Sequence, residues 1–433
     1  MTPPILAYYG DDLTGSTDVM EALELRGVPT VLFTGIPSAA QATRFPDKRA
    51  IGLAGTSRSE TPDWMDEHLP ALLSWLKSLQ PSICHYKVCS TFDSAPHVGS
   101  IGRALDIGAG IFGQSSTLLV VGAPELRRYT AFGHLFAGFR EASYRIDRHP
   151  VMSRHPVTPM DEADLRIHLG RQTDKAVGLI DLTRLKQGIN DAQVDAIFEN
   201  WPIVMMDVLD AETQRLVGSQ LWRLRERFPF VVGSSGVEYA LTADGAGTPL
   251  SGGRCDFVGP GSRGPIAVVS GSCSPTTASQ IQNALQHGFA GIAVDALRLS
   301  TNEASQEIAR AVEAGSAAIG RGLSPILYTA LGSETVQNAL SATGHRVGAG
   351  LGRILAALVA RHGLRRAVVA GGDTSSHALS ELGIFALECL MPLPHSPGSP
   401  LCIAHLAAGS LLEIAFKGGQ VGKDDYFRVA RDI

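Results

Sequence analysis

Short apolar runs rich in β-branched residues alternate with helical patterns along the first 240 residues. Each run is typical of a buried strand, whereas the segments between them repeat apolar positions every three or four residues. The predicted strands are 5–9, 30–33, 50–54, 84–88, 118–122, 177–180, 204–207 and 230–232, and the helices include 17–26, 63–79 and 211–227. Strands that alternate with helices indicate βαβ units, a largely parallel sheet and hence an α/β domain.

The alternation stops at residues 243–265, a stretch dense in Gly, Pro and Ser that is typical of a linker. It then resumes, with strands at 266–270, 291–294, 326–329 and 367–370, helices at 276–287, 304–314 and 348–362, and a β-rich tail at 386–391, 401–405 and 411–416. We therefore expect two α/β domains with mostly parallel sheets, at 1–242 and 266–433. An active-site cleft between two such domains is expected.

Composition narrows the classes of function. The chain has 433 residues, of which 44% are hydrophobic, and a net charge of −5 without a Lys/Arg-rich run, which argues against nucleic acid as a partner. No apolar run approaches the roughly 18 residues of a membrane span, and the N-terminus lacks the pattern of a signal peptide. We expect a cytoplasmic protein without a membrane partner. The six cysteines fit no zinc spacing and are expected to be free thiols.

Two acidic residues, Asp11 and Asp12, follow the first predicted strand and precede a helix. Ligands of open α/β sheets bind at the carboxyl ends of strands, so this turn faces the expected crevice. Its carboxylates fit the binding of polyol hydroxyls or the role of a general base. The alternative is that Asp11, Asp12 or Thr14 only caps the helix.

A lysine, Lys87, ends another predicted strand and is soon followed by Ser90 and Thr91. At the end of a strand, the ammonium group of Lys87 would be placed to pair with a substrate carboxylate. An edge-strand lysine that reaches solvent explains the sequence equally well.

Three turns in the second half combine small and hydroxyl residues. They contain Ser270, Ser272 and Ser274; Gly371, Gly372, Asp373 and Thr374; and Gly418, Gly419 and Gly422. Glycines let the backbone approach a phosphate, a helix N-terminus favours anions, and a carboxylate such as that of Asp373 suits Mg²⁺. The alternative is a set of tight capped turns, with Asp373 as an N-cap. The last turn is one residue too short for a Walker A loop, so a P-loop NTPase is excluded.

Together these motifs resemble the four-carbon acid sugar kinase family, in the same order and over nearly the whole chain. The matching segments are Tyr9-Gly-Asp-Asp-Leu-Thr-Gly15, Lys87-Val-Cys-Ser-Thr91, His155-Pro-Val-Thr-Pro-Met160 with a helix expected from Asp161, Gly271-Ser-Cys-Ser274, Gly371-Gly-Asp-Thr-Ser375, Lys417-Gly-Gly-Gln-Val-Gly422 and Asp425-Tyr-Phe427. The resemblance implies an N-terminal substrate domain, a C-terminal nucleotide domain, ATP, Mg²⁺ and phosphorylation of a terminal hydroxyl of a short sugar acid. Substrates in the family include threonate, erythronate, 3-oxo-tetronates and the branched 3-oxo-isoapionate.

The resemblance also implies site residues. Asp12 is expected to orient or deprotonate the hydroxyl, with Asp11 and Ser90 beside the substrate, and Lys87 with an arginine is expected to hold the carboxylate. The family usually continues Ser-Thr with Leu-Arg-Gly, but here Phe92-Asp93-Ser94 follows. We expect Arg127 or Arg128 to supply the missing charge. The exchange favours a variant subgroup that acts on a branched or oxo sugar acid.

Two other classes of protein remain as alternatives. A two-lobed, non-catalytic small-ligand-binding protein has a similar outline, but its usual representatives are exported. A nicotinamide-dependent oxidoreductase is also α/β, but the chain lacks the strand-linked dinucleotide fingerprint. The oligomeric state stays open, with a homodimer as one expectation.

Overall fold

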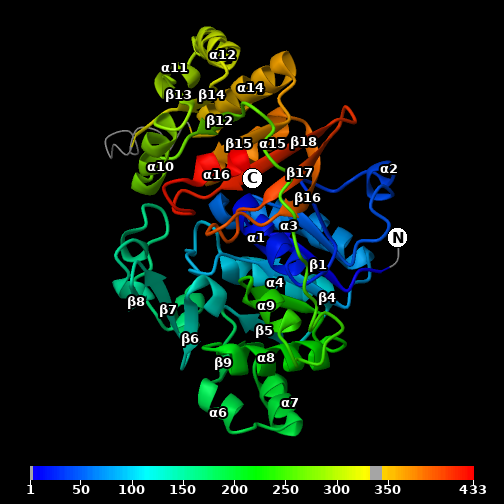
Figure 1. The fold of residues 1–433 in the computed structure, drawn as a ribbon. Coiled ribbons are helices and arrows are strands. Elements are labelled where there is room, and N and C mark those ends of the chain that lie inside the picture. The colour runs from blue at the N-terminus through cyan, green and yellow to red at the C-terminus, as the bar shows by residue number, and fades with distance from the viewer. Residues whose placement is uncertain (1–2, 332–343) are drawn as a thin grey trace. The chain divides into compact units, whose positions relative to one another are not determined.

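The computed structural model describes residues 3–331 and 344–433, and the chain divides into two compact units (Figure 1). Unit 1 comprises Met1–Val31 and Ile36–Cys255, and unit 2 comprises Leu32–Gly35 and Asp256–Ile433. The second boundary lies inside the glycine-rich stretch 243–265, which contains no helix or strand. Both units are α/β, and this fold class confirms the prediction from the sequence.

Unit 1 is built on a parallel sheet in the strand order β3-β1-β4-β11-β5-β10-β9. The strands are β1 Leu6–Gly10, β3 Ala50–Ala54, β4 Ile83–Lys87, β5 Thr117–Val120, β9 Val177–Ile180, β10 Ile203–Met206 and β11 Phe230–Gly233. The helices are α1 Leu13–Glu24, α2 Ala39–Ala42, α3 Pro62–Ser78, α4 Ile101–Phe112, α5 Leu165–Leu169, α6 Leu182–Lys186, α7 Asp191–Asn200, α8 Ala211–Leu224 and α9 Gly236–Thr242, and short 3-10 turns include η1 Ser57–Ser59 and η2 Pro124–Leu126. All residues of β1 and β4 are buried, as expected of parallel strands covered on both faces.

The register of this sheet aligns three strand ends. Gly10 at the end of β1 pairs with Ala54 at the end of β3 and with Lys87 at the end of β4. The residues that follow these strands therefore emerge side by side at the carboxyl edge of the sheet.

Two parts of unit 1 differ from the sequence-based expectations. A small antiparallel sheet of β6 Arg128–Ala131, β7 His134–Phe139 and β8 Ala142–Arg145 was not predicted, because its short strands are partly exposed and lack a buried apolar run. The prediction of a helix from Asp161 is wrong. The helix α5 begins at Leu165 with Asp164 as its N-cap, because Glu162 instead accepts hydrogen bonds from the backbone N–H groups of Ala163 and Asp164.

The strands of unit 2 follow the order β13-β14-β12-β15-β18-β17-β16, parallel from β13 to β18 and antiparallel from β18 through β17 to β16. Its strands are β12 Ala267–Ser270, β13 Phe289–Ala293, β14 Ser324–Tyr328, β15 Arg366–Ala370, β16 Ile384–Met391, β17 Leu401–Leu406 and β18 Leu411–Lys417. Its helices are α10 Pro275–Leu285, α11 Ala296–Leu299, α12 Ala304–Gly320, α14 Gly344–His362, α15 Gly372–Glu381 and α16 Tyr426–Asp432. The end of β2 (Thr30–Phe33) pairs with β16, which explains why Leu32–Gly35 groups with this unit.

A fully buried arginine, Arg366, lies at the start of β15 in unit 2. Its guanidinium lies 2.6 Å from a carboxylate oxygen of Glu413 on β18 and also donates to the carbonyl oxygens of Gly261, Ala430 and Arg431. The arginine thus connects the sheet to the last helix of the unit.

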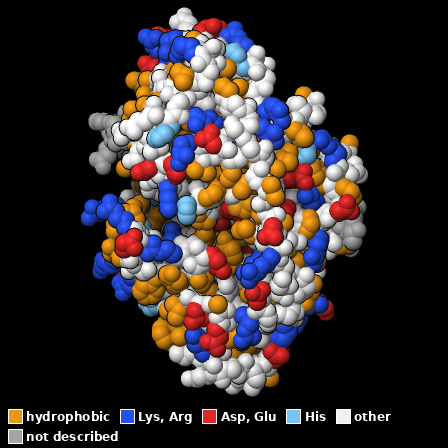
Figure 2. All heavy atoms as spheres, in the orientation of Figure 1, with side chains coloured by type: hydrophobic (Ala, Val, Ile, Leu, Met, Phe, Trp, Pro, Cys, Tyr) orange, Lys and Arg blue, Asp and Glu red, His pale blue; other side chains and the backbone are white. Residues whose placement is uncertain are grey.

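Charged side chains of both signs are interspersed over the visible face, without a broad basic field among the described residues there (Figure 2). None of the helices in the described ranges is long and apolar enough to cross a membrane.

Candidate active site

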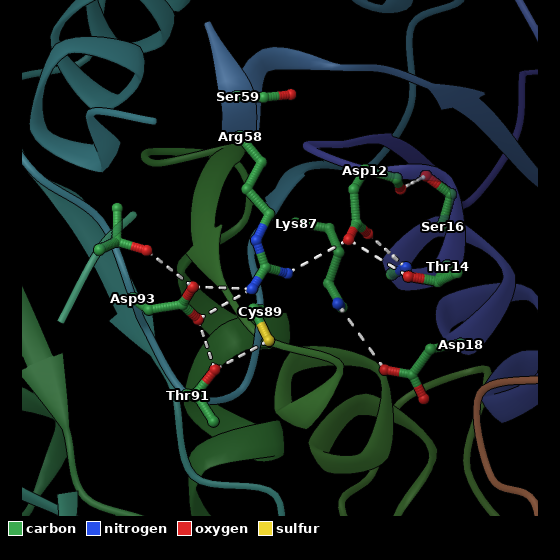
Figure 3. A network of polar contacts seen from close by, with 12 residues as sticks. Asp12, Thr14, Ser16, Asp18, Arg58, Ser59, Lys87, Cys89, Thr91 and Asp93 are labelled. Atoms are coloured by element: carbon green, nitrogen blue, oxygen red, sulfur yellow. Dashed lines mark hydrogen bonds and ion pairs between the residues drawn. The ribbon is translucent and has the colours of Figure 1, made fainter. Parts of the chain in front are cut away.

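The carboxyl edge of the unit 1 sheet gathers charged residues from three neighbouring strands. Asp11 and Asp12 follow β1. Figure 3 shows Asp12 together with Arg58, which lies in η1 just after β3, and Lys87, the last residue of β4. A Cβ added at Gly15, in the first turn of α1, would lie 2.6 Å from Asp12 Oδ1 and 3.1 Å from Lys87 Nζ. The absence of a side chain at this position therefore lets these charged groups converge.

Asp12 is the N-cap of α1, and it also takes part in the charged cluster. Its Oδ1 atom accepts a hydrogen bond of 2.5 Å from the backbone N–H of Gly15, and its Oδ2 atom accepts bonds of 3.2 Å from Thr14 Oγ1 and from Arg58 Nη1. The side chain remains 23% exposed. The capping role and the functional role considered from the sequence are thus compatible: the cap and Arg58 fix a carboxylate that solvent still reaches.

Arg58 connects Asp12 to a second carboxylate, that of Asp93. A single nitrogen, Nη2, lies 3.0 Å from Asp93 Oδ1 and 2.7 Å from Oδ2 (Figure 3). The Asp93 side chain is fully buried, and it also accepts hydrogen bonds of 2.5 Å from Thr91 Oγ1 and 3.1 Å from Thr158 Oγ1. Burial acts to raise the pKa of Asp93, but Arg58 and the Thr91 hydroxyl outweigh it and lower that pKa to about 2. Asp93 is therefore a permanent anion that holds Arg58.

Lys87 is buried, with Nζ 3.7 Å from Asp18 Oδ2 on α1. Burial acts to lower the pKa of Lys87, but the carboxylates of Asp18 and Asp11 outweigh it, so the pKa is raised overall. The alternative of a lysine that reaches solvent is thereby excluded. The ammonium keeps its charge at the edge of the cluster.

Asp11 is buried beside Asp12, with one oxygen, Oδ1, that has no hydrogen-bond partner among the described residues. Burial and the neighbouring charge of Asp12 raise the pKa of Asp11 to about 7. Its backbone is tied on both sides, because its N–H donates to Lys87 O and its carbonyl accepts from the N–H of Arg58. Asp11 thus titrates near neutral pH inside a rigid turn.

The remaining residues predicted for the substrate lie in different settings. Ser90 is buried, and in the sequence it lies between Lys87 and Asp93. Arg127 is exposed and turns away, with its guanidinium donating to the carbonyl oxygens of Arg140 and Ala142. Arg128 is partly buried. Burial lowers its pKa, while Cys89, Asp18 and Asp93 act in the opposite direction. The Nη1 atom of Arg128 donates to the carbonyl oxygens of Leu126 and Arg127, while its buried Nε atom has no hydrogen-bond partner among the described residues.

In unit 2, the three turns predicted to bind the nucleotide meet at one edge of the sheet. Ser270 of β12 pairs with Ala370 of β15, which pairs with Lys417 of β18, so the three strands end side by side. The N–H of Gly271 donates to Ala370 O at 3.1 Å, and the N–H of Gly371 donates to Lys417 O at 2.8 Å. The turns that begin at residues 271, 371 and 418 are thus adjacent.

Close packing between these turns explains several of their glycines. Gly371 has a φ of +117°, a conformation that side chains disfavour. A Cβ added at Gly271 would lie 2.2 Å from Thr374 Oγ1, and one at Gly419 would lie 3.1 Å from Ser272 Oγ. Gly418 and Gly422 belong to the same turn as Gly419, and Gly372 is exposed. The backbones therefore approach as the sequence-based argument for a phosphate cradle requires.

Polar groups at this edge fit an anion. The Oγ atoms of Ser270 and Ser274 are buried and have no hydrogen-bond partner among the described residues, while Ser272 Oγ accepts from the N–H of Ser274. The helix α10 begins directly afterwards at Pro275, so its unpaired N–H groups point toward the same turns. Free hydroxyl groups and a helix N-terminus together suit the phosphates of a nucleotide.

The magnesium prediction remains a prediction. The helix α15 begins at Gly372. Asp373 lies in its first turn, but its side chain is outside the described part of the structure. Among the residues described, no group of three or more His, Cys, Asp or Glu side chains is arranged to hold a metal ion. Mg²⁺ in nucleotide sites needs only one or two carboxylates besides the phosphates.

The sequence did not identify Arg58 as a member of the charged cluster. The available signal was its position, within the polar segment Thr56-Ser-Arg-Ser59 that follows the buried strand β3. The same logic of strand ends that selected Asp11 and Lys87 applies to it.

Comparisons with known proteins agree with this division of the chain. Residues 6–241 match a sugar-binding N-terminal domain, and residues 267–427 match a nucleotide-binding C-terminal domain. A 3-oxo-isoapionate kinase of Paraburkholderia graminis is 44% identical, over 99% of this chain and 94% of the relative. A 3-oxo-tetronate kinase of Methylobacterium radiotolerans is 31% identical, over 99% of both chains. A crystal structure of a Salmonella typhimurium LT2 protein has a TM-score of 0.77 at 26% identity, covering 98% of both chains.

Proposed function

The chain belongs to the four-carbon acid sugar kinase family, and from this premise we propose that it transfers the γ-phosphoryl group of ATP to a hydroxyl of a branched 3-oxo sugar acid, of the 3-oxo-isoapionate type. Membership in the family and the activity of a sugar-acid kinase confirm the expectation from the sequence. The choice of a branched substrate is supported by the identity of 44% to the 3-oxo-isoapionate kinase, against 31% to a 3-oxo-tetronate kinase.

The observation that carries the proposal is the fixed and partly exposed carboxylate of Asp12, close to the ammonium of Lys87. An attacking hydroxyl must lose its proton as the phosphoryl group arrives, so a carboxylate is needed within hydrogen-bond distance of that hydroxyl. Since the Gly15 N–H and Arg58 already orient Asp12, little reorganisation is required during the reaction. We assign to Asp12 the role of accepting the proton at a carboxylate oxygen.

Lys87 and Arg128 are the cations that we assign to the carboxylate of the sugar acid. Asp93 and Asp12 already bind Arg58, and two backbone carbonyls bind Arg127. The charge of Lys87 is sustained by Asp18. Arg128 donates through Nη1 to two backbone carbonyls, but its buried Nε has no hydrogen-bond partner among the described residues. Asp11 and Ser90 complete the proposed substrate surface.

For the nucleotide, we assign the turns around Ser270–Ser274, Gly371–Thr374 and Gly418–Gly422 to the phosphates of ATP. When bound, ATP supplies the phosphoryl group, and the protein's contribution is to position it through backbone N–H groups and serine hydroxyls. Asp373 is the side chain that we assign to Mg²⁺.

The test is ADP release from Mg²⁺-ATP across 3-oxo-isoapionate, the 3-oxo-tetronates, threonate and erythronate. We expect the highest kcat/KM with 3-oxo-isoapionate. A preference for a four-carbon acid would refute the branched substrate while leaving the kinase activity intact. The Asp12→Asn variant, run in parallel, controls for ATP hydrolysis by contaminants.

A further inference from the structure

Lys417, the last residue of β18, carries a buried amine that the proposed reaction does not use. Its side chain is fully buried, and Nζ lies 3.0 Å from Thr277 Oγ1, 2.9 Å from Gly418 O and 3.3 Å from Gly419 O. An ammonium has three N–H donors, and this site offers three oxygen acceptors. The surroundings therefore match the charged form of the amine in geometry.

The same surroundings provide no opposite charge. Among the side chains described, no carboxylate forms an ion pair with Lys417, and all three acceptors are uncharged oxygens. The helix α10, with Thr277 in its first turn, adds the positive end of its dipole. Burial lowers the pKa of Lys417 to about 7. The three hydrogen-bond acceptors thus fit the protonated amine, but no described carboxylate balances its charge.

Few other titratable groups face this amine. The ring of Tyr426 on α16 lies 5.8 Å from Nζ, and α10 contains no titratable residue. Cys273 lies in the turn before α10, and the turn after β18 carries Lys423, Asp424 and Asp425, of which the first two are exposed. Since none of the described carboxylates pairs with the amine, a nucleotide bound at this edge would bring the negative charge.

Hydrogen bonds from side chains of α10 hold the glycine turn, residues 418–423, next to the amine. Thr277 Oγ1 donates to Gly419 O at 3.0 Å, and Gln280 Nε2 donates to the carbonyl oxygens of Val421 and Lys423, both at 3.0 Å. Any phosphate held by the N–H groups of this turn would be separated from Lys417 by one layer of backbone.

We propose that Lys417 is the buried counter-charge of the nucleotide phosphates, and that nucleotide binding draws one proton from the buffer onto its amine. The inference rests on the proposed binding of the nucleotide at this edge. The ammonium acts through the loop and does not touch the phosphates, because its three N–H groups are already used. It is a positioning residue.

The test is calorimetric titration of the protein with ADP and Mg²⁺, without sugar acid, in two buffers that differ in ionisation enthalpy. At about pH 8 the phosphates are already ionised, since their second pKa is about 6. We expect wild type to take up close to one proton per ADP bound, because the free amine is then mostly neutral and the phosphates restore its charge.

Three variants make the test specific. Lys417→Met should lose the proton uptake and bind ADP about tenfold or more weakly, whereas Lys417→Arg, which is permanently charged, should keep binding but lose the uptake. Lys186→Met, at an exposed lysine of unit 1 that pairs with Asp210, should retain both the binding of ADP and the proton uptake. Binding of ADP by wild type without proton uptake, or equal uptake by Lys417→Met, would overturn the inference alone. Failure of folded wild type to bind ADP would overturn the proposed nucleotide site as well.

Discussion

A single nitrogen of Arg58 donates to both carboxylate oxygens of Asp93, at 3.0 and 2.7 Å. The resemblance to the kinase family predicts an arginine at the position of Asp93, and the structure holds a fully buried carboxylate there. Its cationic partner, Arg58, lies in the turn that follows β3 and also pairs with Asp12.

Replacement of Asp93 by Asn should impair the sugar-acid site selectively. The variant removes the buried anion that holds Arg58, so Arg58 is left with Asp12 as its charge partner and shifts toward it. We expect kcat/KM for the sugar acid to fall by about 10- to 100-fold, since small misplacements at a reacting group have effects of this size. Steady-state kinetics with each substrate varied in turn would measure it, with the KM for ATP unchanged.

The matched control for that variant is Asp66→Asn, which breaks an exposed ion pair with Arg103. Surface pairs contribute about 1 kcal/mol or less, so turnover should stay at the wild-type level. An Asp93→Asn enzyme with wild-type kinetics would show that Arg58 needs no anchor.

Replacement of Asp12 by Asn should abolish most of the turnover without unfolding α1. Asn is as good an N-cap as Asp, so the Tm should change little, whereas loss of a general base typically costs about 10²- to 10⁴-fold in kcat. Thermal unfolding and kcat measured on the same preparation separate the two roles. Asp181→Asn, at the N-cap of α6, controls for the effect of the cap alone. Near-normal turnover in Asp12→Asn would exclude Asp12 as the base.

Asp11 should make the protein less stable as the pH rises toward 7. Its pKa is raised to about 7 in the folded state from 3.8, so the folded protein binds more protons than the unfolded chain between these values. Stability then falls with increasing pH across this window, by up to about 1.4 kcal/mol per pH unit for one proton. Urea unfolding of wild type and Asp11→Asn at several pH values gives the difference. Identical pH dependence in the two proteins would contradict a titrating Asp11.

The strand-end logic predicted most strands of the large sheet and which polar residues gather at their carboxyl ends, because buried β-branched runs and glycine turns have strong local signatures. Lys87 and the turn at Gly371 were found in this way. The pairing of Arg58 with Asp93 was not, because it joins residues from different strand ends through side chains, and no local pattern encodes such a contact. The role of Asp93 as an anchor, rather than as a lost arginine, depends on burial that only the folded chain reveals.

Replacement of Arg366 by Met should destabilise unit 2. Removal of the buried guanidinium takes the donor away from several backbone carbonyl oxygens. Glu413 loses one of its arginine partners but still pairs with Arg263. Loss of one partner of a buried ion pair costs about 3–5 kcal/mol. Denaturant unfolding would measure the loss, and Arg361→Met, at an exposed pair with Glu313, should change stability by less than about 1 kcal/mol. A similarly small effect for Arg366→Met would refute its role as a link.

The hydrogen bonds from α10 to residues 418–423 affect how nucleotide associates with this turn. Because Thr277 and Gln280 hold the backbone of this turn before any ligand arrives, its conformational entropy is lost during folding and not during association. Nucleotide should then enter in a single kinetic step whose rate is proportional to its concentration, without a slower ordering phase. Differences in affinity between nucleotides should then lie mainly in the dissociation rate, which depends on how well each nucleotide fits the fixed turn.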